Sequence, residues 1–328
     1  MTPLPVRIAG TGVHLPPDVV TNRRLAETLD TSDEWIVDRT GIRERRWLAP
    51  DLATSDMCVS AARPALAAAD RTARDLDAII VATYTSDQPL PSTALIVKEA
   101  LGAFRALTFD ITQAACANGV QALFLGSLLM QTGAAERVLV IAGDSASRVT
   151  DPEDRTTRVF FGDAAGAVVL TRATTPGTGL LGWDFGAELS YDVEIPAGGS
   201  RQPAGPTTFA DRRHYLKMNG RTVWDTATRC LPDSVLNATT QSGLTVDEVS
   251  HFFLHQANLN IVRAAMDKLG VSRDRAPITV DRLGNTGSAG VFTVLHEGFS
   301  SGAVRPGDAF VVSAIGAGFQ WGTLCFRA

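Results

Sequence analysis

The feature that most constrains the fold is an alternation of short β-branched or aliphatic runs with longer stretches rich in Ala and Leu. Short apolar runs bounded by small residues are typical of buried strands, and the longer stretches are typical of helices. The predicted strands are Ala78–Ala82, Val138–Ala142, Ala167–Leu170, Phe252–Leu254 and Ala309–Ser313, and the predicted helices include Ser60–Ala69 and Gly119–Met130. This alternation predicts an α/β fold.

Two of these strands recur at one offset in the chain. The matched positions lie 172 residues apart: Ile80 in LDAIIVA with Phe252 in VSHFFLH, and Val138 in RVLVIAG with Phe310 in DAFVVSA. Segment 6–10 matches segment 178–182 more loosely at the same spacing. A duplicated chain would give two similar halves, 1–172 and 173–328. Chance similarity between apolar strands would give the same alignments, so both interpretations stay open at this stage.

Composition excludes several classes of protein. The 328 residues are 45% hydrophobic and carry a formal net charge of −5, which is ordinary for a globular chain and too apolar for a disordered one. The acidic balance argues against nucleic acid or an anionic membrane surface as a partner. The first residues form no apolar signal region, and no later apolar run approaches the roughly 18 residues of a membrane span. We therefore expect a cytoplasmic protein.

The four cysteines are Cys58, Cys116, Cys230 and Cys325, and their wide spacing suits neither a zinc site nor a disulfide framework. Cys116, in QAACANG, directly precedes the apolar stretch Val120–Met130. A helix that begins there would direct N–H groups and a positive dipole end at a thiolate. Cys116 is thus either a nucleophile or a buried, inert cysteine. For the other three cysteines we expect the inert role.

Two polar residues could assist such a nucleophile. His255 follows the predicted strand Phe252–Leu254, and Asn285 lies in the glycine-rich turn LGNTGSAG. Taken singly, the histidine is explained as a structural or capping residue and the asparagine as a turn former. Taken with Cys116, they supply the imidazole and the amide donor that thioester chemistry needs.

Segment 193–217 is rich in Pro and Gly and has no hydrophobic periodicity. We expect a long surface loop here, and loops of this length often cover binding sites.

Further motifs have the order and spacing of a known family. They are TSDEWIV at 31–37, RTGIRERR at 39–46, FGDAAGA at 161–167, HQAN at 255–258, GNT at 284–286 and GAGFQWG at 316–322. From about residue 6 to its end, the chain resembles a β-ketoacyl-ACP synthase III of the thiolase superfamily. The resemblance implies a duplicated thiolase-like α-β-α-β-α layered sandwich that forms a homodimer. It implies a coenzyme A thioester as substrate, with no metal and no permanently bound cofactor.

The resemblance also implies a role for individual residues. Cys116 matches the acylated nucleophile, with His255 and Asn285 as its partners, and the backbone N–H groups of Cys116 and Ala317 match the oxyanion hole. The residues that match coenzyme A contacts are Trp35, Arg39 and Arg155. Leu90 takes a place often held by a larger aromatic residue that reaches across the dimer into the partner's acyl pocket. Phe292 is a candidate to fill the space that this exchange leaves.

The chain departs from the family pattern in three places. Asp225 and Asn260 stand where basic residues that bind acyl carrier protein are frequent. The turn after Asn285 begins with Gly287-Ser288 instead of the usual Ser-Ala. These departures favour a role in specialised metabolism and leave acyl carrier protein as only a candidate partner.

Three hypotheses follow. The first is decarboxylative condensation of the acyl group with a malonyl thioester, which the intact Asn285 amide favours because it can donate to an enolate oxygen. The second is transfer of the acyl group to a hydroxyl or amine, giving an ester or amide without condensation. The third, a non-enzymatic binding relative, is disfavoured because the three candidate catalytic residues are all present. We rank condensation first.

Overall fold

Two β-sheets organise the chain, of which the computed structural model describes residues 4–112 and 114–328. The first sheet has the order β1-β7-β6-β4-β5, with strands Val6–His14, Asp163–Arg172, Arg137–Ser145, Ala78–Ala82 and Leu107–Ile111. The second has the order β11-β12-β13-β8, with strands Val249–Leu254, Ala309–Gly316, Gln320–Arg327 and Gly179–Ala187. All five predicted strands are confirmed, and each lies within an observed strand.

The two sheets have the same topology. Reading β8-β13-β12-β11 against β1-β7-β6-β4, the first two pairs of neighbours are antiparallel and the last pair is parallel in both sheets. Strand β4 begins at Ala78 and β11 at Val249, while β6 begins at Arg137 and β12 at Ala309, close to the 172-residue offset seen in the sequence. The fold is thus a duplicated one. We propose 1–172 and 173–328 as the two copies, a division that the repeated strand order supports.

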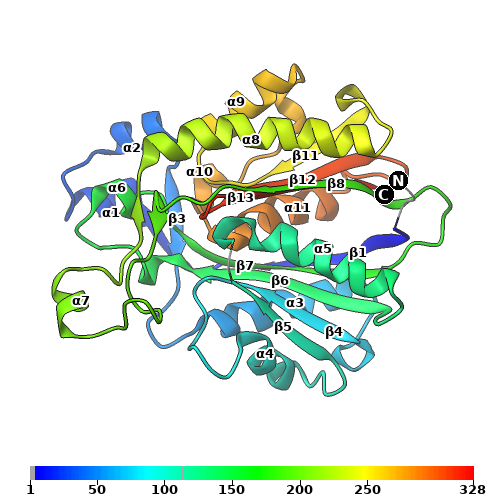
Figure 1. Cartoon of the computed structure of the whole chain (residues 1–328), viewed down its shortest axis with the longest axis horizontal. Coiled ribbons are helices and arrows are strands. Elements are labelled where there is room, and N and C mark those ends of the chain that lie inside the picture. The colour runs from blue at the N-terminus through cyan, green and yellow to red at the C-terminus, as the bar shows by residue number, and fades with distance from the viewer. Residues whose placement is uncertain (1–3, 113) are drawn as a thin grey trace.

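Helices complete a five-layered arrangement (Figure 1). Helices α5 (Asn118–Gln131) and α11 (Gly290–Ser300) lie between the two sheets. Helices α3 (Thr54–Ala68) and α4 (Thr93–Leu101) cover the outer face of the first sheet, and α8 (Gly220–Gln241) and α9 (Leu259–Leu269) cover that of the second. The buried apolar residues accordingly form three main clusters, one between the sheets and one under each outer pair of helices.

The remaining elements are short. The helices are α1 (Asn22–Ala26), α2 (Asp33–Thr40), α6 (Arg155–Arg158), α7 (Pro206–Ala210) and α10 (Val280–Leu283). Two small antiparallel sheets pair β2 (Asp18–Thr21) with β3 (Glu44–Trp47) and β9 (Val193–Glu194) with β10 (Lys217–Met218). The 3₁₀ turns are η1 (Ala73–Asp75), η2 (Ala115–Ala117), η3 (Ala146–Arg148), η4 (Val246–Glu248), η5 (Arg273–Arg275) and η6 (Gly287–Ala289).

Two segments refine the sequence-based expectations. Helix α3 begins at Thr54, before the predicted Ser60, because the Asp56 carboxylate accepts the Ala53 N–H at 2.7 Å and so caps an earlier turn. The expected loop at 193–217 is closed at its base by the β9–β10 pair and contains α7. In the described ranges, none of the helices combines the length and the apolar character that a membrane crossing needs.

Candidate active site

Cys116 lies in η2, the turn that leads directly into helix α5. The turn is fixed by the Asn118 side chain, whose Oδ1 accepts the Ala114 N–H at 2.8 Å, and by the Ser288 hydroxyl, which donates to the Ala115 carbonyl at 3.0 Å. The helix start that the sequence predicted next to Cys116 is therefore confirmed.

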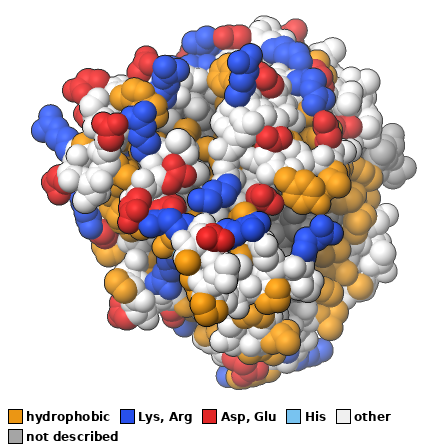
Figure 2. All heavy atoms as spheres, turned by 60° about the vertical axis from the view of Figure 1, so that its left-hand side comes forward, with side chains coloured by type: hydrophobic (Ala, Val, Ile, Leu, Met, Phe, Trp, Pro, Cys, Tyr) orange, Lys and Arg blue, Asp and Glu red, His pale blue; other side chains and the backbone are white. Residues whose placement is uncertain are grey.

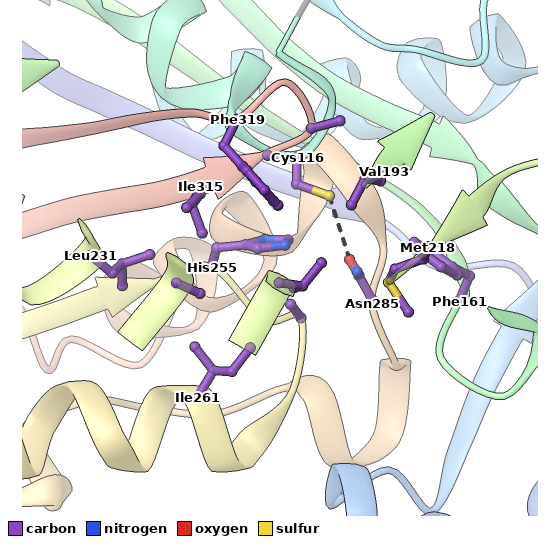
Figure 3. Close-up of a pocket in the computed structure, with 15 residues that line it drawn as sticks. Cys116, Phe161, Val193, Met218, Leu231, His255, Ile261, Asn285, Ile315 and Phe319 are labelled. Carbon is purple, nitrogen blue, oxygen red and sulfur yellow. Dashed lines mark hydrogen bonds between the residues drawn. The ribbon is translucent and has the colours of Figure 1, made fainter. Parts of the chain in front are cut away.

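His255 and Asn285 reach the same place from the second half of the chain (Figure 3). His255 directly follows β11, and its backbone N–H donates to the Ser313 carbonyl on β12 at 2.8 Å. Asn285 is held through its backbone: its N–H donates to the Phe160 carbonyl at 2.8 Å, and its carbonyl accepts the Gly162 N–H at 3.0 Å. The FGDAAGA motif therefore begins at the segment that positions Asn285, a role that sequence analysis did not assign to it.

The orientation of the Asn285 amide follows from its neighbours. Its Oδ1 accepts the Gly287 N–H at 3.0 Å and lies 3.9 Å from the Cys116 sulfur, the contact drawn in Figure 3. A backbone N–H can only donate, so the amide atom beside Gly287 is the oxygen. The Nδ2 group is then the part of the amide that can donate to a ligand.

His255 is buried, with 4% of its surface exposed, and its burial lowers the pKa of the imidazole to about 4. The ring is therefore neutral near pH 7, with one nitrogen a donor and the other an acceptor. Within residues 4–112 and 114–328, neither ring nitrogen has a hydrogen-bond partner. A buried polar group left unpaired costs about 1–3 kcal/mol, so the ring is poised to bind a polar ligand atom.

Burial raises the pKa of the Cys116 thiol to about 12, and the nearby Asp144 carboxylate adds to the increase. The side-chain contact with Asn285 and the backbone N–H of Cys116 itself oppose this rise. Loss of hydration therefore outweighs the favourable dipole of the helix start, and the resting group is a thiol. Attack by Cys116 must therefore be coupled to removal of its proton.

Asp144 is a central residue of the site that sequence analysis missed. It lies on β6 with no exposed surface, and burial raises its pKa to about 6. Its Oδ1 accepts the hydroxyls of Thr83 and Thr85 at 2.9 and 3.0 Å and the Tyr84 N–H at 2.9 Å, while its Oδ2 accepts the Ser288 N–H at 2.7 Å. One carboxylate thus joins the segment after β4 to the turn after Asn285. A carboxylate at the end of the apolar run RVLVIAGD was the available signal.

The hairpin between β12 and β13 packs tightly against the cysteine turn. A Cβ atom added to Gly316 would lie 1.9 Å from the Ala114 carbonyl oxygen and 2.8 Å from the Cys116 nitrogen. Only glycine permits this approach. Ala317 follows directly and lines the cavities beside Cys116.

Two cavities meet at Cys116. The residues that line both are Cys116, Phe161, Val193 and Ala317. The first, of about 60 Å³, contains His255 and Asn285 and is otherwise walled by apolar residues: Met218, Val223, Ala227, Leu231, Ala257, Ile261, Ile315, Gly316 and Phe319. The second, of about 200 Å³, is completed by Tyr84, Thr112, Ala115, Glu194, Ile195 and Leu216. The base of the 193–217 loop therefore lines both cavities.

The three residues expected to contact coenzyme A lie outside these cavities. The Arg155 guanidinium carbon is 5.4 Å from the centre of the Trp35 ring, and its Nη1 donates to the Asp30 carbonyl at 2.6 Å. Arg39 has an exposed side chain, and its carbonyl accepts the Asn258 amide at 3.1 Å. Trp35 and Arg155 thus come together as a pair, whereas the Arg39 side chain points into solvent.

The two residues expected in the acyl pocket have different positions. Leu90 is 84% exposed, so its side chain is free to contact a second subunit. Phe292 is 1% exposed and lies in the core between the sheets. It packs closely on Gly166, because a Cβ atom added to that glycine would lie 2.5 Å from the Phe292 Cβ. It is not among the described residues that line either cavity. The expectation that Phe292 fills the acyl pocket is therefore corrected: its side chain is used to pack α11 against β7.

The departures from the family's basic surface are visible in the structure. Asp225 is exposed on α8, and the Asn260 amide donates to the carbonyls of Asp38 and Arg39, both at 3.2 Å, so it ties α9 to α2. Two nearby cations are paired with acids: Lys268 with Asp233 at 2.9 Å and Arg229 with Glu188 at 3.1 Å. Figure 2 brings the left-hand side of Figure 1 forward and shows Lys and Arg side chains mixed with Asp and Glu over that face.

Arg45, from the RTGIRERR motif, is structural. Its side chain has no exposed surface and donates to the Val20 and Val159 carbonyls at 3.1 and 2.7 Å and to Asn22 Oδ1 at 2.7 Å. Burial lowers the pKa of its guanidinium to about 10.

The three cysteines expected to be inert are buried and free, and burial raises the pKa of each thiol. They are Cys58, Cys230 and Cys325.

Comparison with known proteins agrees with this geometry. Residues 109–188 match the family model of 3-oxoacyl-[acyl-carrier-protein (ACP)] synthase III, and residues 239–328 match the model of its C-terminal part. The chain is 42% identical to the β-ketoacyl-[acyl-carrier-protein] synthase III of Symbiobacterium thermophilum, covering 98% of both chains.

Solved structures give the same result. The 3-oxoacyl-[acyl-carrier-protein] synthase III of Aquifex aeolicus superposes with a TM-score of 0.90 at 36% identity, over 98% of this chain and 100% of that one. The priming β-ketosynthase of the R1128 polyketide biosynthetic pathway superposes with a TM-score of 0.90 at 30% identity, over 99% and 97%. The chain therefore belongs to the β-ketoacyl-ACP synthase III family, transferases of the thiolase fold that use acyl-CoA and acyl-carrier-protein thioesters.

Proposed function

We propose that this enzyme accepts an acyl group from acyl-CoA on Cys116 and condenses it with a malonyl thioester, with loss of carbon dioxide. The observation that carries the proposal is the arrangement of His255 and Asn285, which line the same cavity as the cysteine sulfur. A neutral imidazole N–H and an amide N–H are two donors suited to the oxygen of one enolate.

In the first half-reaction, the Cys116 sulfur forms a bond to the thioester carbonyl, and the bond from that carbon to the sulfur of coenzyme A breaks. The thiol proton leaves Cys116 and ends on the departing sulfur, so charge balances. Because the pKa of Cys116 is about 12, a base must carry this proton, and the acceptor nitrogen of neutral His255 lies in the same cavity. The N–H groups of Cys116 and Ala317 would hold the oxyanion, which the close packing of Gly316 on the cysteine turn supports.

In the second half-reaction, the malonyl carboxylate leaves as carbon dioxide, and the electrons of the broken carbon–carbon bond form an enolate. His255 and the Asn285 Nδ2 group donate to its oxygen. The enolate carbon then attacks the acyl carbon on Cys116, the bond from that carbon to the cysteine sulfur breaks, and the sulfur takes up one proton from solvent. Asn285 is prepared for this role because Gly287 and Cys116 occupy its Oδ1.

Coenzyme A would bind outside the catalytic cavities. The Trp35 face and the Arg155 guanidinium suit adenine and phosphate, and the exposed Arg39 side chain adds a second cation. These three contacts are part of the proposal.

A homodimer is also part of the proposal. Strand β5 is an edge strand, and its Leu107 and Phe109 side chains are 53% and 36% exposed. An open edge with apolar side chains is a surface that a second copy would cover. Leu90, 84% exposed, would then extend toward the partner's acyl pocket.

The alternative is acyl transfer to a hydroxyl or amine without condensation. Arg229 and Lys268 are paired with acids, and the Asn260 amide is bound to α2, so few free positive charges remain here to attract an acyl carrier protein. This surface favours a small-molecule acceptor and a role in specialised metabolism.

The cytoplasmic location remains a prediction from the sequence.

Carboxyl-labelled malonyl thioester distinguishes the two reactions when added to enzyme already acylated on Cys116. Condensation releases labelled carbon dioxide, and both His255→Ala and Asn285→Ala should abolish the release. Label retained in an ester or amide product, with none released as gas, would overturn condensation in favour of transfer. Cys116→Ala is the control, because it should acquire no acyl mass.

A further inference from the structure

We propose that Tyr84 determines the acyl specificity of this enzyme: its hydroxyl donates a hydrogen bond to a neutral polar group on the acyl chain carried by Cys116. The preferred substrate would then be an acyl-CoA with a hydroxyl or keto group near the thioester, rather than one with a plain hydrocarbon chain. The inference rests on the proposed function, because it requires an acyl group on Cys116.

The acyl chain has one suitable place in the described part of the molecule. The malonyl thioester must occupy the first cavity, since His255 and Asn285 lie there. The acyl chain must leave that space free while it stays bonded to the sulfur. The second cavity opens from the same cysteine and contains Tyr84.

Tyr84 lines this second cavity, and its hydroxyl is an unused donor. Its oxygen is buried and has no hydrogen-bond partner in the described ranges, 4–112 and 114–328. Burial and the nearby Asp144 carboxylate raise its pKa well above the ordinary value, so the group stays protonated and can donate. An unpaired buried donor is unfavourable, and a bound acceptor would remove this cost.

The Tyr84 backbone is anchored, and its ring lies close to Gly287. The Tyr84 N–H donates to Asp144 Oδ1 at 2.9 Å. A Cβ atom added to Gly287 would lie 2.8 Å from Tyr84 Cε1 and 2.4 Å from Asp144 Oδ2, and Gly287 has a φ of +60°. The usual serine at this position would collide with both groups. The altered turn after Asn285 and the tyrosine therefore fit each other.

The rest of the cavity limits the chemistry of the polar group. Most of the wall is apolar, including Phe161, Ile195 and Leu216. Glu194 also lines this cavity, and a negative charge at this residue would repel an anionic acyl group. A neutral hydroxyl or keto group satisfies both constraints.

The test uses the full-length enzyme and a matched pair of substrates, butyryl-CoA and 3-hydroxybutyryl-CoA. The rate of acyl loading on Cys116 is followed by intact mass over a range of concentrations. We expect kcat/KM for loading to be about tenfold higher with 3-hydroxybutyryl-CoA, the effect of one hydrogen bond of about 1.4 kcal/mol. Tyr84→Phe keeps the ring and removes only the hydroxyl, so it should bring the kcat/KM ratio of the two substrates to about one. Tyr191→Phe changes a tyrosine that is 66% exposed and should alter neither rate.

Each other outcome has a defined meaning. A wild-type enzyme that loads butyryl-CoA as fast as or faster than its 3-hydroxy analogue would overturn the inference, whatever the behaviour of the variant. So would a preference that survives Tyr84→Phe. If Cys116 acquires no acyl mass from either thioester or from acetyl-CoA, the proposed function itself fails, and the inference fails with it. Preferential loading of succinyl-CoA would show that the cavity binds anions and would refute the assignment to neutral groups.

Discussion

The buried imidazole of His255 makes the stability of this enzyme sensitive to acid in a predictable way. Its pKa is about 4 in the folded protein, against 6.5 for an ordinary histidine. A lowered histidine pKa means that the unfolded chain binds a proton before the folded one does. Stability is therefore lost as the pH falls below about 6.5, and the loss levels off below about 4.

Two pKa values set the size of the effect. Between pH 7 and pH 5 the unfolded chain gains about three-quarters of a proton at this residue and the folded chain gains less than about one-tenth, which amounts to about 2 kcal/mol of lost unfolding free energy. The variant His255→Gln has no such group, so its stability should fall by about 2 kcal/mol less over the same interval. Asp144 has a raised pKa of about 6 and acts with the opposite sign, but it is present in both proteins and cancels in the comparison.

Urea unfolding of wild type and His255→Gln at pH 7 and pH 5, with subunit concentration held constant, measures this difference. Equal losses of stability in the two proteins would show that His255 titrates normally. The neutral donor assigned to it in enolate stabilisation would then be wrong. Its role would have to be that of an imidazolium over part of the physiological range.

Four further predictions concern the same site. Asn285→Ala should load Cys116 to near-normal extent in single-turnover assays but release little product, whereas equal losses in both steps would refute this division of labour. The rate of alkylation of Cys116 by iodoacetamide should rise continuously to at least pH 10, because burial raises its pKa to about 12, and a plateau near pH 8 would contradict a resting thiol. Leu90→Phe should narrow the range of acyl-CoAs accepted, and an unchanged profile would show that Leu90 lines no pocket. Asp144→Asn should lower the unfolding free energy by about 1–3 kcal/mol, because its amide would present a second donor to the Ser288 N–H; a change below about 0.5 kcal/mol would count against this contact.

Local sequence patterns predicted five of the nine strands that form the two main sheets. The strand Ala78–Ala82 was predicted with the observed bounds. Its five residues form a continuous apolar run, which is the pattern of a strand buried on both faces of its sheet. Strand β5 was missed because Leu107–Ile111 is an edge strand with exposed alternate residues and only one fully buried position. Helix α8 was missed because its sequence is mixed in polarity and contains Pro232.

The sequence by itself determined the fold class, the family and the identity of Cys116, His255 and Asn285 as candidate catalytic residues, because these depend on motifs whose order survives without coordinates. The tertiary structure decided the states of these groups. Burial, which depends on all surrounding elements, makes Cys116 a thiol and His255 a neutral imidazole. It also revealed Asp144 and Tyr84, whose roles come from contacts between segments that are distant in sequence. Local patterns carry no record of such contacts, since desolvation and long-range hydrogen bonds exist only once the two halves have packed together.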